Sequence, residues 1–551
     1  MEATPTSTVP GLETRAWFAP LLLSGVWLLL LLSVWPAGEF PLNDDWVYAA
    51  SVRSLVEEGR LAPSPYTEAS YVTQALWGGL FCLPGGWSYS ALRLSTAVLG
   101  LAGVLVCFAL LLEAGAGRRL AMLAALTLAA NPLYLNLSLT FMTDVPFAAL
   151  CLAALLFLAR SLRRDSWGDF LVGSALSVAA VLTRQAGLVV ALAYAAVALQ
   201  ARPVRTSRMI QALLSPLLAG AVLLAWHYWA RTRGVDWLSN DRLKDLFTSL
   251  SAGVGGAVGA VSWRAAVALV YVGFFTLPLL APAAAEAWHV GGPAPRHGAQ
   301  VALTFFGLTW VALTATGARM PLSENLLHDS GVGPPTLWDV YIEHLPNLPK
   351  APALLWTGIT VLALIGGALL AGVVAAAALT KALGRSPAVA LVGITASLYA
   401  ALMVTAGYFD RYLILLVPLC AVLVSTVAGG RTPSWLGGRT AFLAGVALAT
   451  TYGLFGAAAT HDYFAWNRAR WAAIDDAIRV RGVPASGFDG GYEWNGLNRY
   501  SPTKPWWWAD REPWVIAFGP VPGYGEVARY PYRRLLPPGE AALLLLHREE
   551  P

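Results

Sequence analysis

Residues 41–48 read Pro41-Leu42-Asn43-Asp44-Asp45-Trp46-Val47-Tyr48 and closely follow the first membrane-length apolar run of the chain. Two adjacent carboxylates at the mouth of a membrane span are costly to hold near lipid, so such groups normally face water or a functional cavity. We therefore interpret Asp44 and Asp45 as the catalytic centre of a membrane enzyme.

The same stretch allows a purely structural interpretation. Asn43 or Asp44 is a good N-cap, and apolar residues from Tyr48 onward recur at helical spacing until Gly59 ends the pattern. This describes a short amphipathic helix on the membrane surface. A cap needs a single residue, which Asn43 alone can supply, so capping leaves the carboxylate pair unexplained.

Composition sets the class of the protein. Of 551 residues, 57% are hydrophobic and 13% charged, and the mean hydropathy is +0.58. A soluble domain has roughly 25% charged residues, so the chain is predicted to be a polytopic membrane protein. The 37 Lys and Arg against 32 Asp and Glu lie scattered in short loops, which favours membrane orientation over nucleic-acid binding. The four cysteines have no paired spacing, so neither a disulfide framework nor a thiolate metal site is indicated.

Apolar runs of spanning length predict an all-α bundle of about thirteen transmembrane helices. The first run is longer than a signal-peptide core, so we expect it to be retained as a span. The predicted spans are 16–37, 88–112, 120–137, 144–160, 168–183, 185–200, 209–230, 262–285, 300–317, 354–380, 387–408, 411–428 and 440–459.

Basic loops orient these spans. The loops at 118–119, 160–164, 202–208, 381–385 and 431–439 all fall on the side of Arg15, which the positive-inside rule makes the cytoplasm. The first loop and the tail then lie on the outer face of the cell membrane, and the Ala-, Leu- and Arg-rich composition suggests a bacterial cell.

Three parts of the chain follow from this orientation. They are a cytoplasmic N-terminal tail (1–15), a transmembrane domain (16–460) whose outer loop 38–87 carries the acidic pair, and an outer C-terminal domain (461–551). In the last part, the short apolar runs Trp514–Phe518 and Ala541–Leu546 alternate with Gly and Pro turns, which predicts a small α/β domain.

Other ionisable residues recur on the predicted outer face. Asp144 stands at the entrance of a span, Arg184 in a turn between two spans, and Asp410-Arg411 in another tight turn. Each has a structural alternative: a helix cap for Asp144, snorkelling for Arg184, and a local ion pair for Asp410-Arg411. Their convergence on one face favours a shared functional site.

These residues also carry a family resemblance. The order of an outer acidic pair, Tyr48, Ala91-Leu92-Arg93-Leu94, Met142-Thr143-Asp144-Val145-Pro146 and Arg411-Tyr412-Leu413 resembles the GT-C glycosyltransferases that use lipid-linked sugars. Within that group it is similar to glycosyltransferase family 39, the protein O-mannosyltransferases and the aminoarabinose transferase of lipid A. The resemblance covers about residues 16–430. It implies transfer, on the outer face, from a polyprenyl- or dolichyl-phosphate sugar.

The resemblance places the family's first-loop acidic motif on Asp44 and Asp45 and its second outer acidic residue on Asp144. Asp45 stands where Glu is common, which leaves open which member of the pair is the base.

The chemistry of such a reaction agrees with these residue types. An acceptor hydroxyl needs a carboxylate base, here Asp44 or Asp45, whereas a phosphate leaves without the general acid that a glycosidase requires. Arginine binds phosphate oxygens through its planar fork, so Arg184 and Arg411 are the predicted phosphate ligands. Asp144 is expected to position acceptor or sugar and Tyr48 to contact substrate. A single displacement would invert the anomeric configuration.

Metal dependence is weakly indicated. His328-Asp329 and Glu343-His344 lie in a long outer loop without the spacing of a recognised ligand motif, and a solvated loop is the simpler interpretation. Arginines that neutralise the phosphate make a metal unnecessary, so no cofactor is expected, although a divalent cation is left open.

The sequence thus predicts an integral membrane glycosyltransferase whose partners are a polyprenyl-phosphate sugar, membrane lipid, and a glycan, lipid or protein acceptor. The main alternative is a transporter or lipid flippase, which would place ionisable groups near mid-membrane and often has two related halves. A ligase or polymerase of lipid-linked glycans and a binding module centred on the tail are further alternatives.

Overall fold

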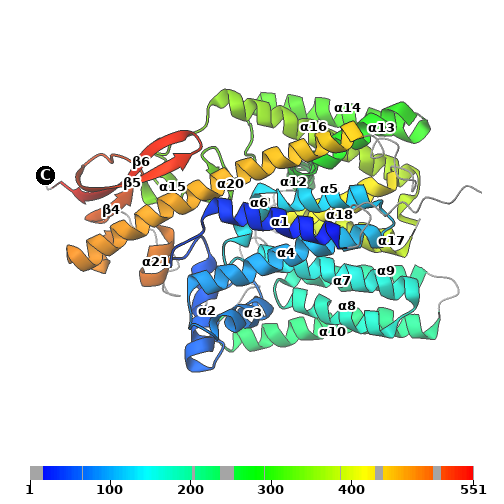
Figure 1. Cartoon of the computed structure of the whole chain (residues 1–551), viewed down its shortest axis with the longest axis horizontal. Helices are drawn as coiled ribbons and strands as arrows, with labels where there is room; N and C mark the ends of the chain where they lie inside the picture. Colours follow the sequence, from blue (N-terminus) through cyan, green and yellow to red (C-terminus); the bar gives the residue numbers. More distant parts are fainter. Residues whose placement is uncertain are drawn as a thin grey trace, which may run out of the picture.

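The computed structural model describes residues 17–64, 66–200, 205–235, 253–290, 292–384, 386–427, 439–499 and 511–549. The predicted N-terminal tail (1–15) and parts of the predicted basic loops 202–208 and 431–439 lie outside these ranges. The helices run roughly along one direction as a bundle, with a small sheet at one end (Figure 1).

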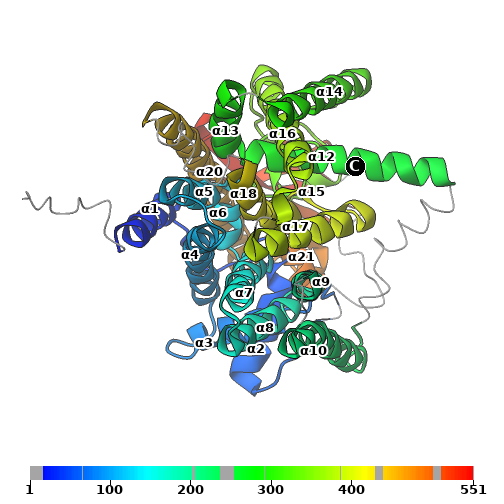
Figure 2. The same cartoon turned by 90° about the vertical axis from the view of Figure 1, so that its right-hand side faces the viewer.

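Fifteen helices of the described residues make up the bundle. They are α1 (Phe18–Val34), α4 (Tyr89–Glu113), α5 (Arg118–Ala129), α6 (Pro132–Ser138), α7 (Asp144–Arg164), α8 (Trp167–Val181), α9 (Leu188–Gln200), α10 (Thr206–Arg231), α12 (Val254–Phe275), α13 (Leu277–Val290), α14 (Pro293–Thr316), α16 (Ala353–Leu379), α17 (Pro387–Ala406), α18 (Leu416–Val427) and α20 (Arg439–Asp475). Viewed end-on, α6 and α18 lie near the middle, with α10 and α14 at the margin (Figure 2).

Eight helices of the described residues are long and apolar enough to cross a membrane, or nine if the bent pair α5 and α6 forms one span. This confirms a mostly helical, multi-pass membrane protein, but not the count of about thirteen spans. Several predicted spans appear as shorter apolar helices, such as α1, α8 and α9.

Breaks in two predicted spans have local causes. Between α5 and α6 the axis bends by 61°. Asn131 is extended there because a residue before proline avoids helical geometry, and its side chain caps α6 by accepting from Leu133 and Tyr134. The predicted span 262–285 is likewise divided, because α12 ends at Phe275 and α13 begins at Leu277.

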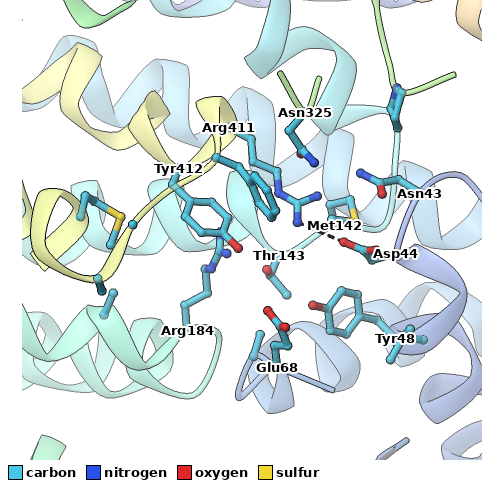
Figure 3. Close-up of a pocket in the computed structure, with 18 of the residues that line it drawn as sticks. Asn43, Asp44, Tyr48, Glu68, Met142, Thr143, Arg184, Asn325, Arg411 and Tyr412 are labelled. Atoms are coloured by element: carbon cyan, nitrogen blue, oxygen red, sulfur yellow. Dashed lines mark hydrogen bonds and ion pairs between the residues drawn. The ribbon is translucent and has the colours of Figure 1, made fainter. Parts of the chain in front are cut away.

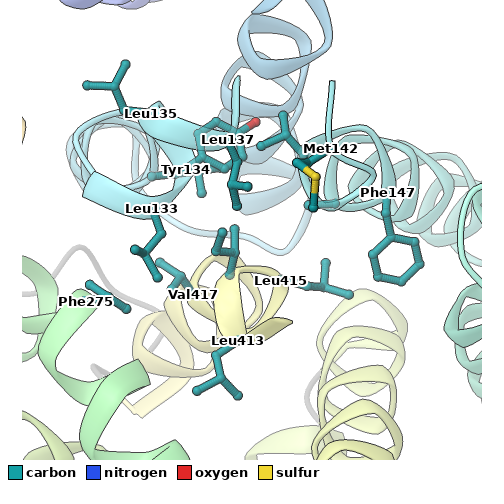
Figure 4. Packing of buried hydrophobic residues seen from close by; sticks show 14 of the residues in the cluster. Leu133, Tyr134, Leu135, Leu137, Met142, Phe147, Phe275, Leu413, Leu415 and Val417 are labelled. Atoms are coloured by element: carbon teal, nitrogen blue, oxygen red, sulfur yellow. The ribbon is translucent and has the colours of Figure 1, made fainter. Parts of the chain in front are cut away.

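Small residues allow the bundle helices to approach closely. A Cβ on Gly273 of α12 would lie 2.3 Å from the backbone of Gly366 in α16. Such close backbone contact is typical of helix packing in membranes. Leu413 and Leu415, in the turn that follows α17, and Val417 of α18 pack in one buried cluster with side chains of α6 and α7 (Figure 4).

The acidic stretch leads into α2 (Asp45–Glu58), which ends at Gly59 in the left-handed conformation, as predicted. The alternative interpretation described this segment as a short amphipathic helix on the membrane surface, and the helix itself is confirmed. Residues 45–49 are all buried. Trp46 stacks on Tyr66 with ring centroids 5.8 Å apart, so the first half of α2 packs inside the protein. The short helix α3 (Val72–Cys82) follows at the same end of the bundle (Figure 1).

The predicted small mixed domain is confirmed in its coarse form. Strands β3 (Phe488–Asp489), β4 (Trp514–Ala517), β5 (Tyr524–Leu535) and β6 (Pro538–Arg548) form one sheet in the order β3-β4-β6-β5. Strand β3 is parallel to β4 and the other pairs are antiparallel. The short helices α15 (Trp338–Tyr341) and α21 (Tyr492–Arg499) lie beside it (Figure 1).

The sheet is packed onto the bundle. Helix α20 runs without interruption through residue 460 to Asp475 and connects the two parts. The ring of Trp466 on α20 lies 5.1 Å from that of Phe518 after β4. Buried residues of the strands, such as Leu543 and Leu545, belong to the same hydrophobic cluster as the bundle core. The end of the bundle and the C-terminal strands therefore share one hydrophobic core.

Candidate active site

A cavity of about 520 Å³ opens at the end of the bundle that carries α2, α15 and α21. Its walls come from segments far apart in the sequence, and Figure 3 shows acidic, basic and aromatic side chains pointing into one space. The residues that line it include Asp44, Tyr48, Glu68, Arg184, Asn325, Arg411, Tyr412 and Tyr492.

Asp44 faces this cavity. Its Oδ2 accepts from Nη2 of Arg411 at 3.0 Å, and its Oδ1 accepts from the hydroxyl of Tyr492 at 2.5 Å. Although Asp44 precedes α2, its side chain makes no capping hydrogen bond to the helix. Capping therefore does not account for the Asp44 carboxylate.

Asp45 is turned away from the cavity and is fully buried. Its carboxylate accepts from the backbone N–H groups of Leu42 at 2.7 Å and Phe141 at 3.3 Å. Burial raises the pKa of Asp45 to about 8, against the opposing effect of the Arg93 charge. Asp45 thus ties the first loop to the segment before α7, and the two neighbouring carboxylates have different surroundings.

This burial predicts a pH dependence of stability. Between pH 3.8 and about 8 the folded protein holds a proton on Asp45 that the unfolded chain has lost, so raising the pH favours unfolding. We expect the melting temperature of the purified protein to fall across this interval and to fall less steeply in Asp45→Asn. Identical pH slopes in wild type and variant would contradict this environment for Asp45.

Arg93 holds the beginning of the first loop, just after α1, in place. Its guanidinium is buried and donates to the backbone oxygens of Gly38 (2.5 Å) and Phe40, and it lies 4.8 Å from the centroid of the Phe40 ring. A buried arginine that satisfies loop carbonyls fixes the path of that loop. The Ala91–Leu94 motif therefore has a structural role next to the acidic stretch.

Asp144 and Arg184 form an ion pair through Oδ1 and Nη1. Asp144 is the first residue of α7, and the N-cap position before it is Thr143, whose side chain makes no capping hydrogen bond. Asp144 is therefore not the cap of this helix. Arg184 follows α8 at the cavity wall, with its guanidinium 4.2 Å from the centroid of the Tyr412 ring. Asp144 is nearly buried behind Arg184, so the structure presents the arginine and not the carboxylate to the cavity.

Arg411 stands in the 3₁₀ turn η5 (Asp410–Leu415) and is 5% exposed. Asp410 beside it accepts from the backbone N–H groups of Leu326, Leu327 and Arg411 and so anchors the turn, while the guanidinium of Arg411 pairs with Asp44. Nε and Nη1 of Arg411 are buried and have no hydrogen-bond partner among the residues that the structure describes. Buried donors without partners are costly, so this charge is suited to an anion that enters the cavity.

Tyr48 also contributes to the wall, and its hydroxyl and the Glu68 carboxylate point into the same space (Figure 3). The structure thus brings Asp44, Tyr48, Arg184 and Arg411 to one cavity, with Asp144 directly behind. Sequence reasoning missed Tyr492, Glu68 and Asn325, because none of them stands in a motif or a periodic pattern that marks it.

A metal centre is not indicated by side-chain clustering. Within the described residues, no group of three or more His, Cys, Asp or Glu side chains could hold a metal ion. His328 lies in the cavity wall, and its Nε2 donates to the backbone oxygen of Asn325, 2.8 Å away. Glu343 instead lies 3.9 Å from Arg511.

Part of the chain matches a known protein family. Residues 70–229 match the family model of dolichyl-phosphate-mannose-protein mannosyltransferase, which confirms the family resemblance over that part of the chain. No curated protein sequence matches the chain.

Solved structures give distant likenesses. ArnT from Cupriavidus metallidurans, bound to undecaprenyl phosphate, is 13% identical, with 86% of this chain and 83% of that chain covered and a TM-score of 0.49. The Pmt1-Pmt2 protein O-mannosyltransferase complex of S. cerevisiae, bound to the sugar donor, is 16% identical, with 40% and 35% covered and a TM-score of 0.31. The oligosaccharyltransferase of Archaeoglobus fulgidus, tethered with an acceptor peptide, is 13% identical, with 85% and 59% covered and a TM-score of 0.38. All three TM-scores lie below 0.5.

Proposed function

We propose that this chain, whose residues 70–229 belong to the dolichyl-phosphate-mannose-protein mannosyltransferase family, is a membrane glycosyltransferase that uses a polyprenyl-phosphate sugar. The observation that supports this most is the pairing, in one cavity, of the Asp44 carboxylate with the Arg411 guanidinium, whose Nε and Nη1 have no hydrogen-bond partner in the described part of the chain. A base and an anion ligand side by side are what the transfer of a phosphate-linked sugar to a hydroxyl requires.

Asp44 is the base in this proposal. The acceptor hydroxyl gives its proton to Asp44 as its oxygen forms a bond to the anomeric carbon. The bond between that carbon and the phosphate oxygen breaks, and its electron pair leaves with the phosphate. The products are a glycoside and the polyprenyl phosphate, and a single displacement inverts the anomeric configuration. Asp45 lacks access to the cavity and serves to hold the loop.

The two arginines carry the leaving group. Arg411 offers its unpartnered N–H groups to the phosphate and Arg184 adds a second charge. Asp144 holds Arg184 through their ion pair, which makes Asp144 a positioning residue. Tyr48 contacts the substrate from the side of α2. Preorganised charge of this kind stabilises the negative charge that develops on the departing phosphate.

The proposal also includes the membrane topology of the protein. It includes about thirteen spans, a cytoplasmic N-terminus, and an outer C-terminal part that begins near residue 461. The basic loops on the side of Arg15 support this orientation, because loops rich in Lys and Arg stay in the cytoplasm. In this orientation the cavity lies on the face away from the cytoplasm. The acceptor is a glycan, a lipid or a protein hydroxyl.

Turnover of defined donors tests the function. Purified full-length protein in lipid vesicles is given radiolabelled polyprenyl phosphates that carry mannose, aminoarabinose or other sugars, and the release of polyprenyl phosphate is measured. We expect one donor class to be consumed. Movement of labelled lipid across the vesicle membrane without loss of its sugar would identify a flippase and overturn the proposal.

A further inference from the structure

The C-terminal segment reaches the acidic stretch through a buried network. Glu493 of α21 accepts from the backbone N–H of Asn43 at 2.8 Å and pairs with Arg470 of α20 at 2.5 Å. The side chains of Glu493 and Arg470 are both fully buried. The hydroxyl of Thr336 donates to Glu493 at 2.9 Å, and the backbone oxygen of Thr336 accepts from the N–H of Tyr492. Removing one partner of a buried ion pair strongly destabilises a protein, because the other charge is left buried and unpaired. This network therefore holds α21 against the first loop.

Close packing reinforces that attachment. The ring of Trp46 lies so near Gly496 of α21 that a Cβ there would be 2.5 Å away. Trp46 is stacked in turn on Tyr66, whose hydroxyl lies 3.2 Å from that of Tyr492. The position of Tyr492 relative to Asp44 is therefore set by several independent contacts.

The hydrogen bond from Tyr492 to Asp44 has a defined direction. Burial raises the pKa of Tyr492 well above its ordinary value, and the nearby Asp44 charge raises it further. The phenol keeps its proton and donates it toward Oδ1 of Asp44, while Arg411 donates to Oδ2. Both oxygens of the carboxylate are thus held from opposite sides, one by the C-terminal segment and one by the turn after α17.

We infer that Tyr492 is a positioning residue for Asp44, so that the C-terminal segment completes the active site instead of being a separate binding module. This inference rests on the proposed function, because Asp44 must be the base for its orientation to matter. The donated hydrogen bond fixes the carboxylate rotamer that faces the cavity. It also stabilises the charged form that accepts the proton of the acceptor.

Tyr492→Phe tests the inference, because it removes the hydroxyl and keeps the ring. The chain offers a matched control in Tyr530→Phe, since the hydroxyl of Tyr530 donates to Asp476 in the same segment, away from the cavity. With the donor that the wild type consumes, we expect kcat of Tyr492→Phe to fall roughly ten- to hundred-fold, the effect of one hydrogen bond to a charged group. Tyr530→Phe should keep the wild-type kcat.

Two further readouts separate positioning from a general loss of structure. The loss in Tyr492→Phe should fall on kcat and leave KM for the donor near its wild-type value, because Tyr492 acts through the orientation of Asp44. The melting temperature should match that of Tyr530→Phe. An active wild type together with an unchanged kcat in Tyr492→Phe would overturn this inference alone. A wild type that consumes no donor would overturn the proposed function and this inference with it.

Discussion

Asp44→Asn is expected to reduce sugar transfer by about 10²- to 10⁴-fold, the usual contribution of a positioned general base. The amide has nearly the size of the carboxylate and can still accept from Tyr492, but it cannot take a proton from the acceptor hydroxyl. Its N–H₂ group could also face Nη2 of Arg411, which would weaken that contact. The measurement is the initial rate of polyprenyl phosphate release by purified full-length protein.

The matched control for this variant is Asp165→Asn. Asp165 follows α7 and lies 3.2 Å from Arg208. Asp165→Asn therefore removes an aspartate–arginine pair of the same kind outside the cavity. This control should retain the wild-type rate. A folded Asp44→Asn protein that transfers sugar at the rate of Asp165→Asn would show that Asp44 is not the base.

Arg411→Met is expected to lower kcat/KM by about 10²- to 10³-fold, comparable to the loss of one preorganised donor at a developing charge. The methionine keeps an apolar side chain in the turn but removes the unpartnered Nε and Nη1 donors. Arg411→Lys should recover part of the activity, because an ammonium supplies charge without the planar fork. Inhibition by added polyprenyl phosphate should weaken in parallel if Arg411 binds the leaving group.

Arg163→Met is the matched control for Arg411. Arg163 pairs with Glu113 at 2.5 Å near the end of α7 and does not line the cavity. We expect its transfer rate and its inhibition by polyprenyl phosphate to equal those of wild type. Wild-type inhibition in Arg411→Met would place the phosphate elsewhere.

Much of the site could be predicted from sequence because its charges interrupt apolar runs. A carboxylate or an arginine at the end of a spanning segment stands out whatever the tertiary structure, and one membrane face limits where such groups can meet. Asp44, Arg184 and Arg411 were identified in this way, and the structure brings all three to one cavity. Asp44 and Arg411 are 367 positions apart in the chain.

Other features depend on contacts that no local pattern encodes. Asp44 and Asp45 are chemically identical neighbours, but Asp44 faces the cavity, whereas the Asp45 carboxylate is fully buried and accepts from backbone N–H groups. Tyr492 reaches Asp44 across 448 positions, through α20 and the network around Glu493. Helix breaks such as the one at Asn131 also divide a continuous apolar run into shorter helices, which the apolar pattern of the sequence does not show.

The configuration of the transferred sugar tests the central claim most directly, namely that Asp44 promotes a direct displacement of the lipid phosphate. The product formed from a donor of known anomeric configuration is examined by NMR before any chemical equilibration. Our mechanism predicts inversion, because the acceptor oxygen attacks opposite the departing phosphate. Retention would require an intermediate and two displacements, and would contradict a mechanism in which Asp44 acts as a base.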